Sequence, residues 1–254
     1  MKKYLPAVLL ILAFGFAKLN FEQKLTEEHR SAYFHGAKLN LDLRQKLGQF
    51  GFLAALSGFR SIVADMLWIK AHTEWEQTAW GRMALLFDTV TALQPRNVMF
   101  WDMSAWQMAW NASLAAFQDP KQPDLKLRLK AQREYFDLGR DFLIRGIQNN
   151  PDNYRLYQAL GNLYNQKYGD HLAASEQYEL AARFPDAPSY IKRMAAYELA
   201  QCPGHEREAY VKLREIYDMG QKQWLPTLLQ RLRQMEEKLQ IPEDQRAKVP
   251  PGFK

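Results

Sequence analysis

The sequence predicts an all-α protein in which helix pairs repeat along the chain, preceded by one apolar segment at the N-terminus. No stretch alternates apolar and polar residues in the way that a half-buried strand does. Apolar residues instead recur at every third or fourth position, as they do along Val63, Leu67, Ala71 and Trp75. Prolines divide the remaining chain into pieces of helix length. These observations predict a solenoid of short helices.

The composition is that of a folded protein with one large domain or two small ones. Of its 254 residues, 47% are hydrophobic and 24% are charged, which excludes a disordered protein and a multi-pass transporter. The single cysteine, Cys202, excludes a disulfide framework. The net charge is +6, but Lys2, Lys3 and Lys18 supply half of it. The rest of the chain is too weakly basic to predict a nucleic-acid partner.

The N-terminus has the pattern of a membrane segment or an export signal. Lys2 and Lys3 precede an uncharged run over 4–17, and apolar residues continue to Phe21. As a helix, residues 4–21 would span about 27 Å, enough for a bilayer core. We expect an uncleaved anchor over 1–21; the alternative is a signal cleaved near Ala17. Either way the remaining chain is expected outside the cytoplasm, in the periplasm if the source is bacterial, where the anchor would cross the inner membrane once with its N-terminus cytoplasmic.

Residues 22–61 are expected to form a helical cap. Within them, 41–56 predicts a helix with an apolar end that either seals the first repeat or lies on the membrane surface. Sealing is favoured because the ends of solenoids need caps. Arg60 and Asp65 interrupt an apolar stretch, too far apart around a helix to pair. Each is expected to contact backbone or a neighbouring helix, with Asp65 in a buried ion pair.

The clearest repeat unit lies at 153–187. Its pattern is an aromatic residue, a Leu-Gly pair and a tyrosine at helical spacing, then a Gly-Asp turn and a second helix closed by proline. The residues that define it are Tyr157, Leu160, Gly161, Tyr164, Gly169, Ala174, Tyr178, Ala181 and Pro185. Gly161 and Ala174 are small because two helices must approach closely there, and Gly169 permits the turn. The unit resembles a tetratricopeptide repeat (TPR), with one residue inserted before Gly169.

Weaker copies of this unit flank it, which predicts about four helix pairs over 62–220. The expected units are 62–96, 97–152, 153–187 and 188–220, with an inserted loop near 113–130 in the second. Residues 221–240 predict a capping helix and 241–254 a tail. Together with the N-terminal segment, the chain resembles a group of membrane-anchored bacterial TPR proteins. That resemblance implies a right-handed α-α superhelix and no established activity.

Residues with catalytic potential are few, and none forms a recognisable motif. His72 and Glu76 lie four apart, which is the spacing of half a metal site but also of a solvated helix pair. Asp65 is a candidate general acid, although a structural ion pair is the simpler interpretation. Cys202 precedes Pro203-Gly204, which fits a passive turn cysteine better than a reactive thiol. We therefore expect no enzyme activity, no cofactor and no metal.

Two further clusters have both a structural and a functional interpretation. Trp101, Trp106 and Trp110 predict a core cluster, or a partner anchor if they are exposed. The basic residues between Lys121 and Arg133 predict a solvated face, with anionic lipid or an acidic partner as the alternative.

The TPR resemblance implies that the first helix of each pair lines a concave groove. Such grooves hold a peptide or a helix, often through asparagines that bond to peptide backbone. The expected partner-binding residues are Gln107, Asn111, Gln158, Asn162, Asn165, Lys192 and Arg193. The alternative is that these amides bond locally. The expected function is a non-catalytic scaffold or adaptor for a protein partner at the membrane; the alternatives are a structural subunit of an envelope assembly that binds through its outer faces, and an envelope enzyme.

Overall fold

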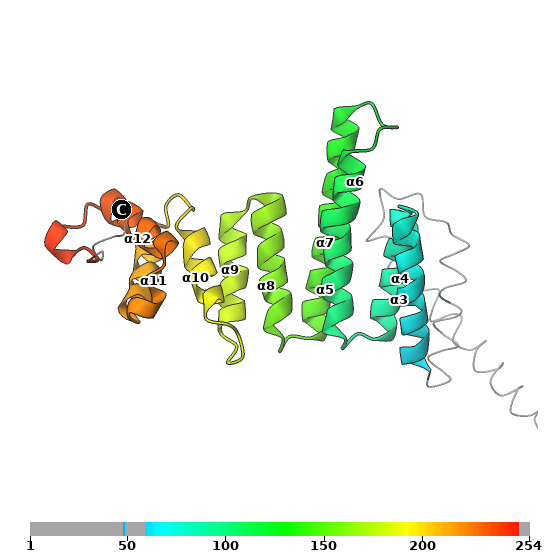
Figure 1. Ribbon diagram of the computed structural model, residues 1–254, viewed down its shortest axis with the longest axis horizontal. Coiled ribbons are helices and arrows are strands. Elements are labelled where there is room, and N and C mark those ends of the chain that lie inside the picture. Colours follow the sequence, from blue (N-terminus) through cyan, green and yellow to red (C-terminus); the bar gives the residue numbers. More distant parts are fainter. Residues whose placement is uncertain (1–47, 49–58, 249–254) are drawn as a thin grey trace, which may run out of the picture. The chain divides into compact units, whose positions relative to one another are not determined.

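The computed structural model describes Gly48 and residues 59–248, which all belong to one unit of the chain, Asn40–Lys254. Within 59–248 every regular element is a helix, which confirms the all-α class (Figure 1). The expected anchor at 1–21 lies outside the described residues. So do residues 22–47 and 49–58 of the expected cap and residues 249–254 of the expected tail.

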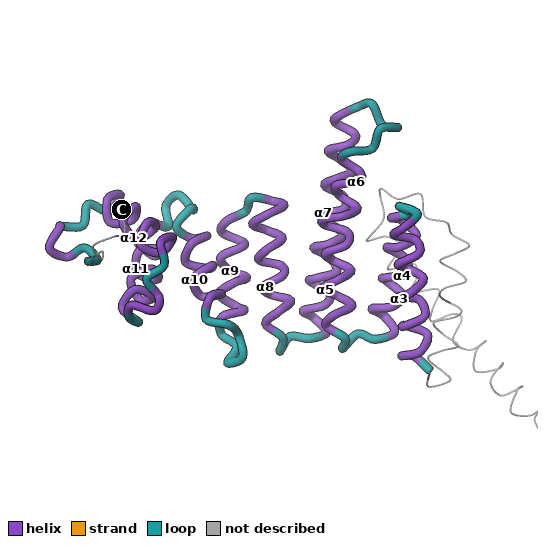
Figure 2. The backbone as a smooth tube through the Cα atoms, in the orientation of Figure 1, coloured by secondary structure: helices purple, strands orange, loops and turns teal. Residues whose placement is uncertain are grey.

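Helices that follow one another in the chain pack side by side, with loops at their ends (Figures 1 and 2). The first pair is α3 (Arg60–Glu76) with α4 (Trp80–Leu93). The second joins α5 (Val98–Trp106), the π-helical turn η2 (Gln107–Ala112) and α6 (Ser113–Phe117) to α7 (Leu125–Asn149). The third is α8 (Tyr154–Leu163), prolonged by the π-helical turn η3 (Tyr164–Tyr168), with α9 (His171–Ala182). The fourth is α10 (Tyr190–Leu199) with α11 (Glu206–Asp218), followed by the 3₁₀ turn η4 (Gln221–Gln223), α12 (Pro226–Lys238) and the 3₁₀ turn η5 (Glu243–Gln245).

Short polar side chains start several of these helices. The side chains of Asn97, Asp124, Asn153 and Asp170 each accept a hydrogen bond from a backbone N–H in the first turn that follows. Such caps satisfy amide groups that a helix leaves unpaired at its N-terminus. Just before Asp170, Gly169 has a φ of +64°, a left-handed conformation that favours glycine. The sequence expectation of a Gly-Asp turn is confirmed.

Glycines mark the places where two helices approach most closely. A Cβ atom on Gly139 of α7 would lie 2.7 Å from Ala109 Cβ and 2.8 Å from the carbonyl oxygen of Ala105. On Gly161 of α8 it would lie 2.6 Å from a ring carbon of Tyr178. Gly161 is therefore small because the buried Tyr178 ring of α9 packs directly on its Cα.

The expectation of an inserted loop near 113–130 is wrong for most of that range. Residues 113–117 are helical in α6, and α7 already begins at Leu125, so that only 118–124 connect the two helices. The extra length of this pair extends its helices instead of forming a loop. The reason is local: 125–130 contains only leucine, lysine and arginine, which are good helix formers, behind the Asp124 cap.

Arg60 and Asp65 differ from expectation, because both are exposed on α3. The buried acid of the first pair is Glu74, whose carboxylate lies 2.6 Å from the Arg82 guanidinium of α4. Helix α3 turns Ala64 and Ala71 towards the core, which leaves Asp65 on another side of the helix.

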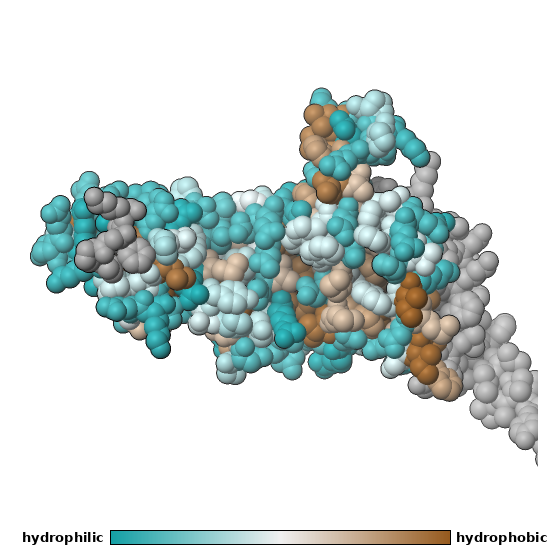
Figure 3. Space-filling model, viewed as in Figure 1, coloured by the Kyte–Doolittle hydropathy of each residue, from teal (hydrophilic) through white to brown (hydrophobic). Residues whose placement is uncertain are grey.

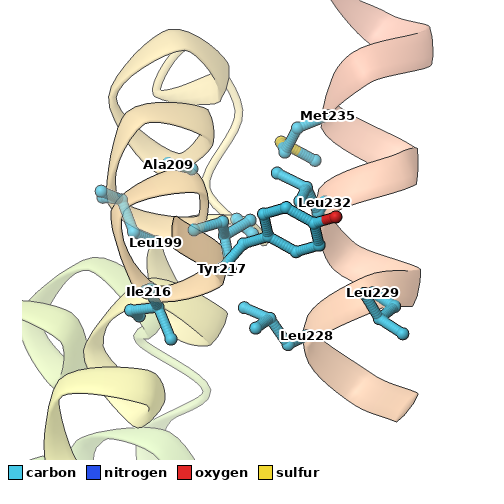
Figure 4. Packing of buried hydrophobic residues seen from close by; sticks show 11 residues of the cluster. Leu199, Ala209, Ile216, Tyr217, Leu228, Leu229, Leu232 and Met235 are labelled. Carbon is cyan, nitrogen blue, oxygen red and sulfur yellow. The ribbon is translucent and has the colours of Figure 1, made fainter. Parts of the chain in front are cut away.

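The C-terminal end of the described chain has a core of its own, formed by α10, α11 and α12. Leu228 and Leu232 of α12 are fully buried against Leu213 and Ile216 of α11 and their neighbours (Figure 4). Tyr217 is stacked on Trp224, with ring centroids 4.7 Å apart. Helix α12 therefore covers apolar residues of α11 that would otherwise face water.

Candidate functional site

The expected partner-binding residues lie on helices that begin a pair. Gln107 and Asn111 are on η2, Gln158 and Asn162 are on α8, Asn165 is on η3, and Lys192 and Arg193 are on α10. Neighbouring first helices are in contact, since α5 touches α8 and the Gln158 amide donates to the Tyr190 hydroxyl of α10 at 2.9 Å. We call the exposed side chains of α5–η2, α8–η3 and α10 the first-helix surface.

Several of these polar side chains bond to other parts of the fold. The Asn111 amide donates to Gln107 at 2.6 Å, and Arg193 donates to the Gln223 side chain at 2.6 Å. Lys192 lies 3.5 Å from Glu215. These bonds hold the side chains in defined positions on the first-helix surface and occupy part of their hydrogen-bonding capacity.

Asn162 and Asn165 are tied more deeply into the packing. The Tyr178 hydroxyl of α9 donates to Asn162 Oδ1 at 2.8 Å, and the Asn165 amide donates to Glu198 of α10 at 2.8 Å. Burial raises the pKa of Tyr178, so the hydroxyl keeps its proton and remains a donor. Both asparagines thus fasten α8–η3 to the next helices along the chain.

Glu198 is a polar centre that the sequence analysis did not identify. Glu198 is only 8% exposed. Its carboxylate lies 2.7 Å from His171 Nδ1 and accepts hydrogen bonds from the Gln201 amide, at 3.1 Å, and from the Asn165 amide. These contacts satisfy a buried carboxylate that would otherwise destabilise the fold. His171 and Glu198 are 27 residues apart and belong to no motif, so only the packing of α9 on α10 brings them together.

The three tryptophans of the expected cluster have different environments: Trp101 is buried, Trp110 is partly buried and Trp106 is exposed. Trp101 is buried beside Gly146 and donates its ring N–H to the Pro95 carbonyl at 2.9 Å, as expected for core. Trp106 is 43% exposed, so the core expectation is wrong for it. Phe100, Trp101, Ser104 and Ala105 occupy the buried side of α5, which leaves Trp106 on the opposite side.

Helix α5 carries a row of exposed apolar side chains. Met99, Met103 and Trp106 are four and three residues apart, which places them on one side of the helix, and each is exposed. We call these three residues the α5 stripe. More than a third of the surface of each of these large side chains is left in water, where it is well suited to contact a partner.

Asp102 of α5 and Arg155 of α8 carry opposite charges where these two helices are in contact. Burial raises the pKa of the Asp102 carboxyl, and the positive charge of Arg155 on α8 opposes that effect. Asp102 is one residue from Met103. The α5 stripe therefore has a carboxyl group beside it.

The residues with catalytic potential form no reactive constellation in the described part of the chain. His72 Nε2 lies 3.6 Å from Glu76 in a well-exposed pair. Among residues 59–248 no group of three His, Cys, Asp or Glu side chains is placed to hold a metal ion. Asp65 is exposed on α3.

Cys202 is buried, and its thiol donates to the Glu198 carbonyl at 3.4 Å. Burial raises the pKa of this thiol, and the nearby carboxylates of Glu198 and Asp170 raise it further. Because the thiolate is the nucleophile, we expect iodoacetamide at pH 8 to alkylate native Cys202 at least about tenfold more slowly than free cysteine. Mass spectrometry of timed samples measures the rate, and the same reaction in denaturant is the control. A native rate equal to the denatured one would contradict this placement.

No helix within the described residues is long and apolar enough to cross a membrane. Comparisons with protein-family models, with curated proteins and with solved structures found no match to this chain. Only the geometry of the described residues therefore indicates which of them form the candidate site.

Proposed function

We propose that the protein is a non-catalytic scaffold or adaptor that binds a protein partner on its first-helix surface. Helix pairs stacked in sequence present a row of first helices, which is the arrangement that TPR proteins use to hold a peptide or a helix. In this proposal the four pairs form a TPR-like superhelix, with α12 as its cap.

The observation that carries the proposal is the α5 stripe. Its three apolar side chains are exposed on a rigid helix whose opposite side is buried. Tryptophan is the residue most enriched among those that dominate binding energy, so Trp106 is the expected anchor. Asn162 and Gln166 are at least partly exposed on the neighbouring α8–η3. A partner that contacts Trp106 would find these hydrogen-bonding groups on the next first helix.

We further propose that residues 4–21 tether the protein to the membrane, with the body on the extracytoplasmic side. The support is the sequence pattern of two lysines followed by an apolar run. A tether would raise the local concentration of the scaffold near membrane partners.

A second candidate is a structural subunit of an envelope assembly. The exposed Trp106 favours it equally, because a subunit that binds through a flat face would also use an exposed tryptophan. The two candidates differ at Lys192, which a groove-bound peptide would reach and a partner docked on α5 alone would not.

The test is a mild-detergent pull-down of the full-length tagged protein with partners identified by mass spectrometry. We expect a stoichiometric envelope protein that Trp106→Ser loses by tenfold or more. Trp75→Ser is the matched control, since Trp75 of α3 is 38% exposed, and it should retain the partner. Loss with Lys192→Ala as well would favour the groove over the flat-face subunit. Recovery of the protein alone, across several detergents and with crosslinking, would contradict the scaffold proposal.

A further inference from the structure

The second helix pair projects beyond its neighbours. Helix α7 has 25 residues and so extends about 37 Å, whereas α9 has 12 and α4 has 14. Figure 1 shows α6 and the first turns of α7 rising past the ends of α8 and α9. The start of α7 therefore has α6 beside it but no neighbouring pair.

One side of this projecting part carries leucines that the described helices leave about half exposed. Leu125 is 49% exposed and Leu129 is 47% exposed, and the two lie one turn apart on the same side of α7. Phe136 lies on the same side of α7 as Leu125, because the eleven positions between them make about three full turns. Phe136 packs against Tyr168 of η3, with ring centroids 6.1 Å apart. The side of α7 that holds Leu125 and Leu129 therefore packs on η3 at Phe136. Nearer the start of α7 the same side remains about half exposed.

We call this feature the ledge: Leu125, Leu129 and Phe136 form its wall, and Lys167 and Tyr168 at the end of η3 form its floor. In the space-filling view, hydrophobic residues gather on the flank of the projecting hairpin that is nearer α8 (Figure 3). Leu127 is equally exposed, at 49%, but lies about 200° around α7 from Leu125 and is not part of the ledge.

Positive charges border the apolar wall. Lys126, Lys130 and Arg133 fall within about 60° of one another around α7, next to the leucine side. Among the described residues Lys126 and Lys130 form no ion pair, and the Arg133 guanidinium lies 4.0 Å from the centroid of the Tyr168 ring.

The acids nearby offset part of this positive charge. Asp119 and Asp124 accept hydrogen bonds from the backbone N–H groups of Lys121 and Lys126. Asp137 is bonded to Arg140 and to the Tyr168 hydroxyl. Glu134 follows Lys130 by four residues and lies about 40° further around α7, so its carboxylate weakens the positive charge on that side of the border. The net charge around the ledge remains positive, because five cations (Lys126, Lys130, Arg133, Arg140 and Lys167) outnumber three acids (Asp124, Glu134 and Asp137).

The floor of the ledge is basic and aromatic. The Lys167 amine lies 4.9 Å from the Trp110 ring centroid and 5.6 Å from that of Phe136. Burial lowers the pKa of the Lys167 amine, and no acid among the described residues opposes this decrease. A carboxylate placed here would meet a cation that is already partly removed from water.

We propose that the ledge docks an acidic amphipathic helix of a partner protein. Two leucines one turn apart match the apolar stripe of a helix, and Lys126, Lys130 and Arg133 match carboxylates spaced three and four residues apart. The wall and floor meet at a step, which fits the rounded side of a helix better than it fits a flat bilayer. This inference deepens the proposed function, since it rests on a scaffold role and names the chemistry of one partner.

The experiment is a fluorescence-anisotropy titration of the full chain in neutral-lipid nanodiscs. The probe is a labelled synthetic 18-residue helix with leucines on one side and glutamates beside them; a version with lysines in place of glutamates is the control peptide. We expect saturable binding of the acidic peptide alone. The double variant Leu125→Ser with Leu129→Ser should weaken it by tenfold or more, and Leu127→Ser should leave it unchanged. Lys126→Glu with Lys130→Glu should weaken it similarly, and added salt should weaken binding to the wild-type chain.

Equal binding of both peptides, equal loss with Leu127→Ser, or no saturable binding would each overturn the ledge. So would abolition of peptide binding by phosphatidylglycerol in the nanodiscs, which would assign the surface to anionic lipid. The proposed function fails separately: Trp106→Ser tests it through partner recovery and should not alter peptide binding. If the peptide fails while recovery still depends on Trp106, the ledge is wrong and the scaffold proposal stands.

Discussion

Replacing Gly161 with leucine is expected to cause the largest loss of stability among single substitutions in the third helix pair. Even the first added carbon would lie 2.6 Å from the Tyr178 ring, which is fully buried. The ring cannot move far, because its hydroxyl is bonded to Asn162. Overpacking of this kind costs about 1–3 kcal/mol and occasionally more. We expect the upper end of that range, and a fall in Tm of about 2–4 °C for each kcal/mol.

Thermal unfolding followed by circular dichroism measures the effect. The matched control is Ala92→Leu, which adds a leucine at an exposed position in α4 and should change Tm little. An unchanged Tm for Gly161→Leu would show that α8 and α9 do not approach each other at this glycine. Gly161→Ala should fall between the wild type and the leucine variant, since it adds only the first of the clashing carbons.

The second large effect is expected at α12, where Leu228→Ala with Leu232→Ala should release the helix from α11. Both leucines are fully buried, and each deletion in a core typically costs about 2–5 kcal/mol. The two lie one turn apart in one cluster, so their effects are not expected to add simply. Because α12 ends the stack of helices, its loss exposes Leu213 and Ile216 without disrupting α3 or α4.

Hydrogen exchange followed by mass spectrometry distinguishes this local effect from global unfolding. We expect faster exchange in α11 and α12 and unchanged exchange in α4. Leu225→Ala is the control, because Leu225 precedes the same helix and is 42% exposed. Uniformly faster exchange along the whole chain would mean that the helix pairs unfold as one unit, contrary to this prediction.

The helical class and the position of the third pair could be predicted because they depend on local signals. Gly169 and Asp170 specify a turn through backbone conformation and capping, whatever surrounds them. Gly161 was expected at a close contact, together with Ala174, because a repeat imposes a regular spacing on its helices. The structure places the Tyr178 ring of α9 against Gly161. The length of α7 also depends on the local sequence, because good helix formers follow the Asp124 cap. Pro120 and Pro123 just before that cap nevertheless led to the expectation of a loop.

The candidate site was less predictable, because exposure is decided by how helices pack. The sequence placed Trp101 and Trp106 in one aromatic cluster, whereas the structure buries the first and exposes the second. Asn162 and Asn165 were expected to face a partner, yet both bond to side chains that come from later helices. The residues that bond to them lie 16 and 33 positions further along the chain, a distance over which one sequence carries no signal.

The sequence by itself determined the all-α class, the glycine at the α8–α9 contact and the turn at Gly169, because periodicity, side-chain size and backbone conformation act over a few residues. Only the tertiary structure decided which polar groups are bonded inside the fold, as Glu198 is, and which apolar side chains stay exposed, as in the α5 stripe and the ledge. Burial depends on which helices meet and how far each extends. For a helix such as α7, which extends past its neighbours, packing decides that Phe136 lies against Tyr168 while Leu125 and Leu129 remain about half exposed.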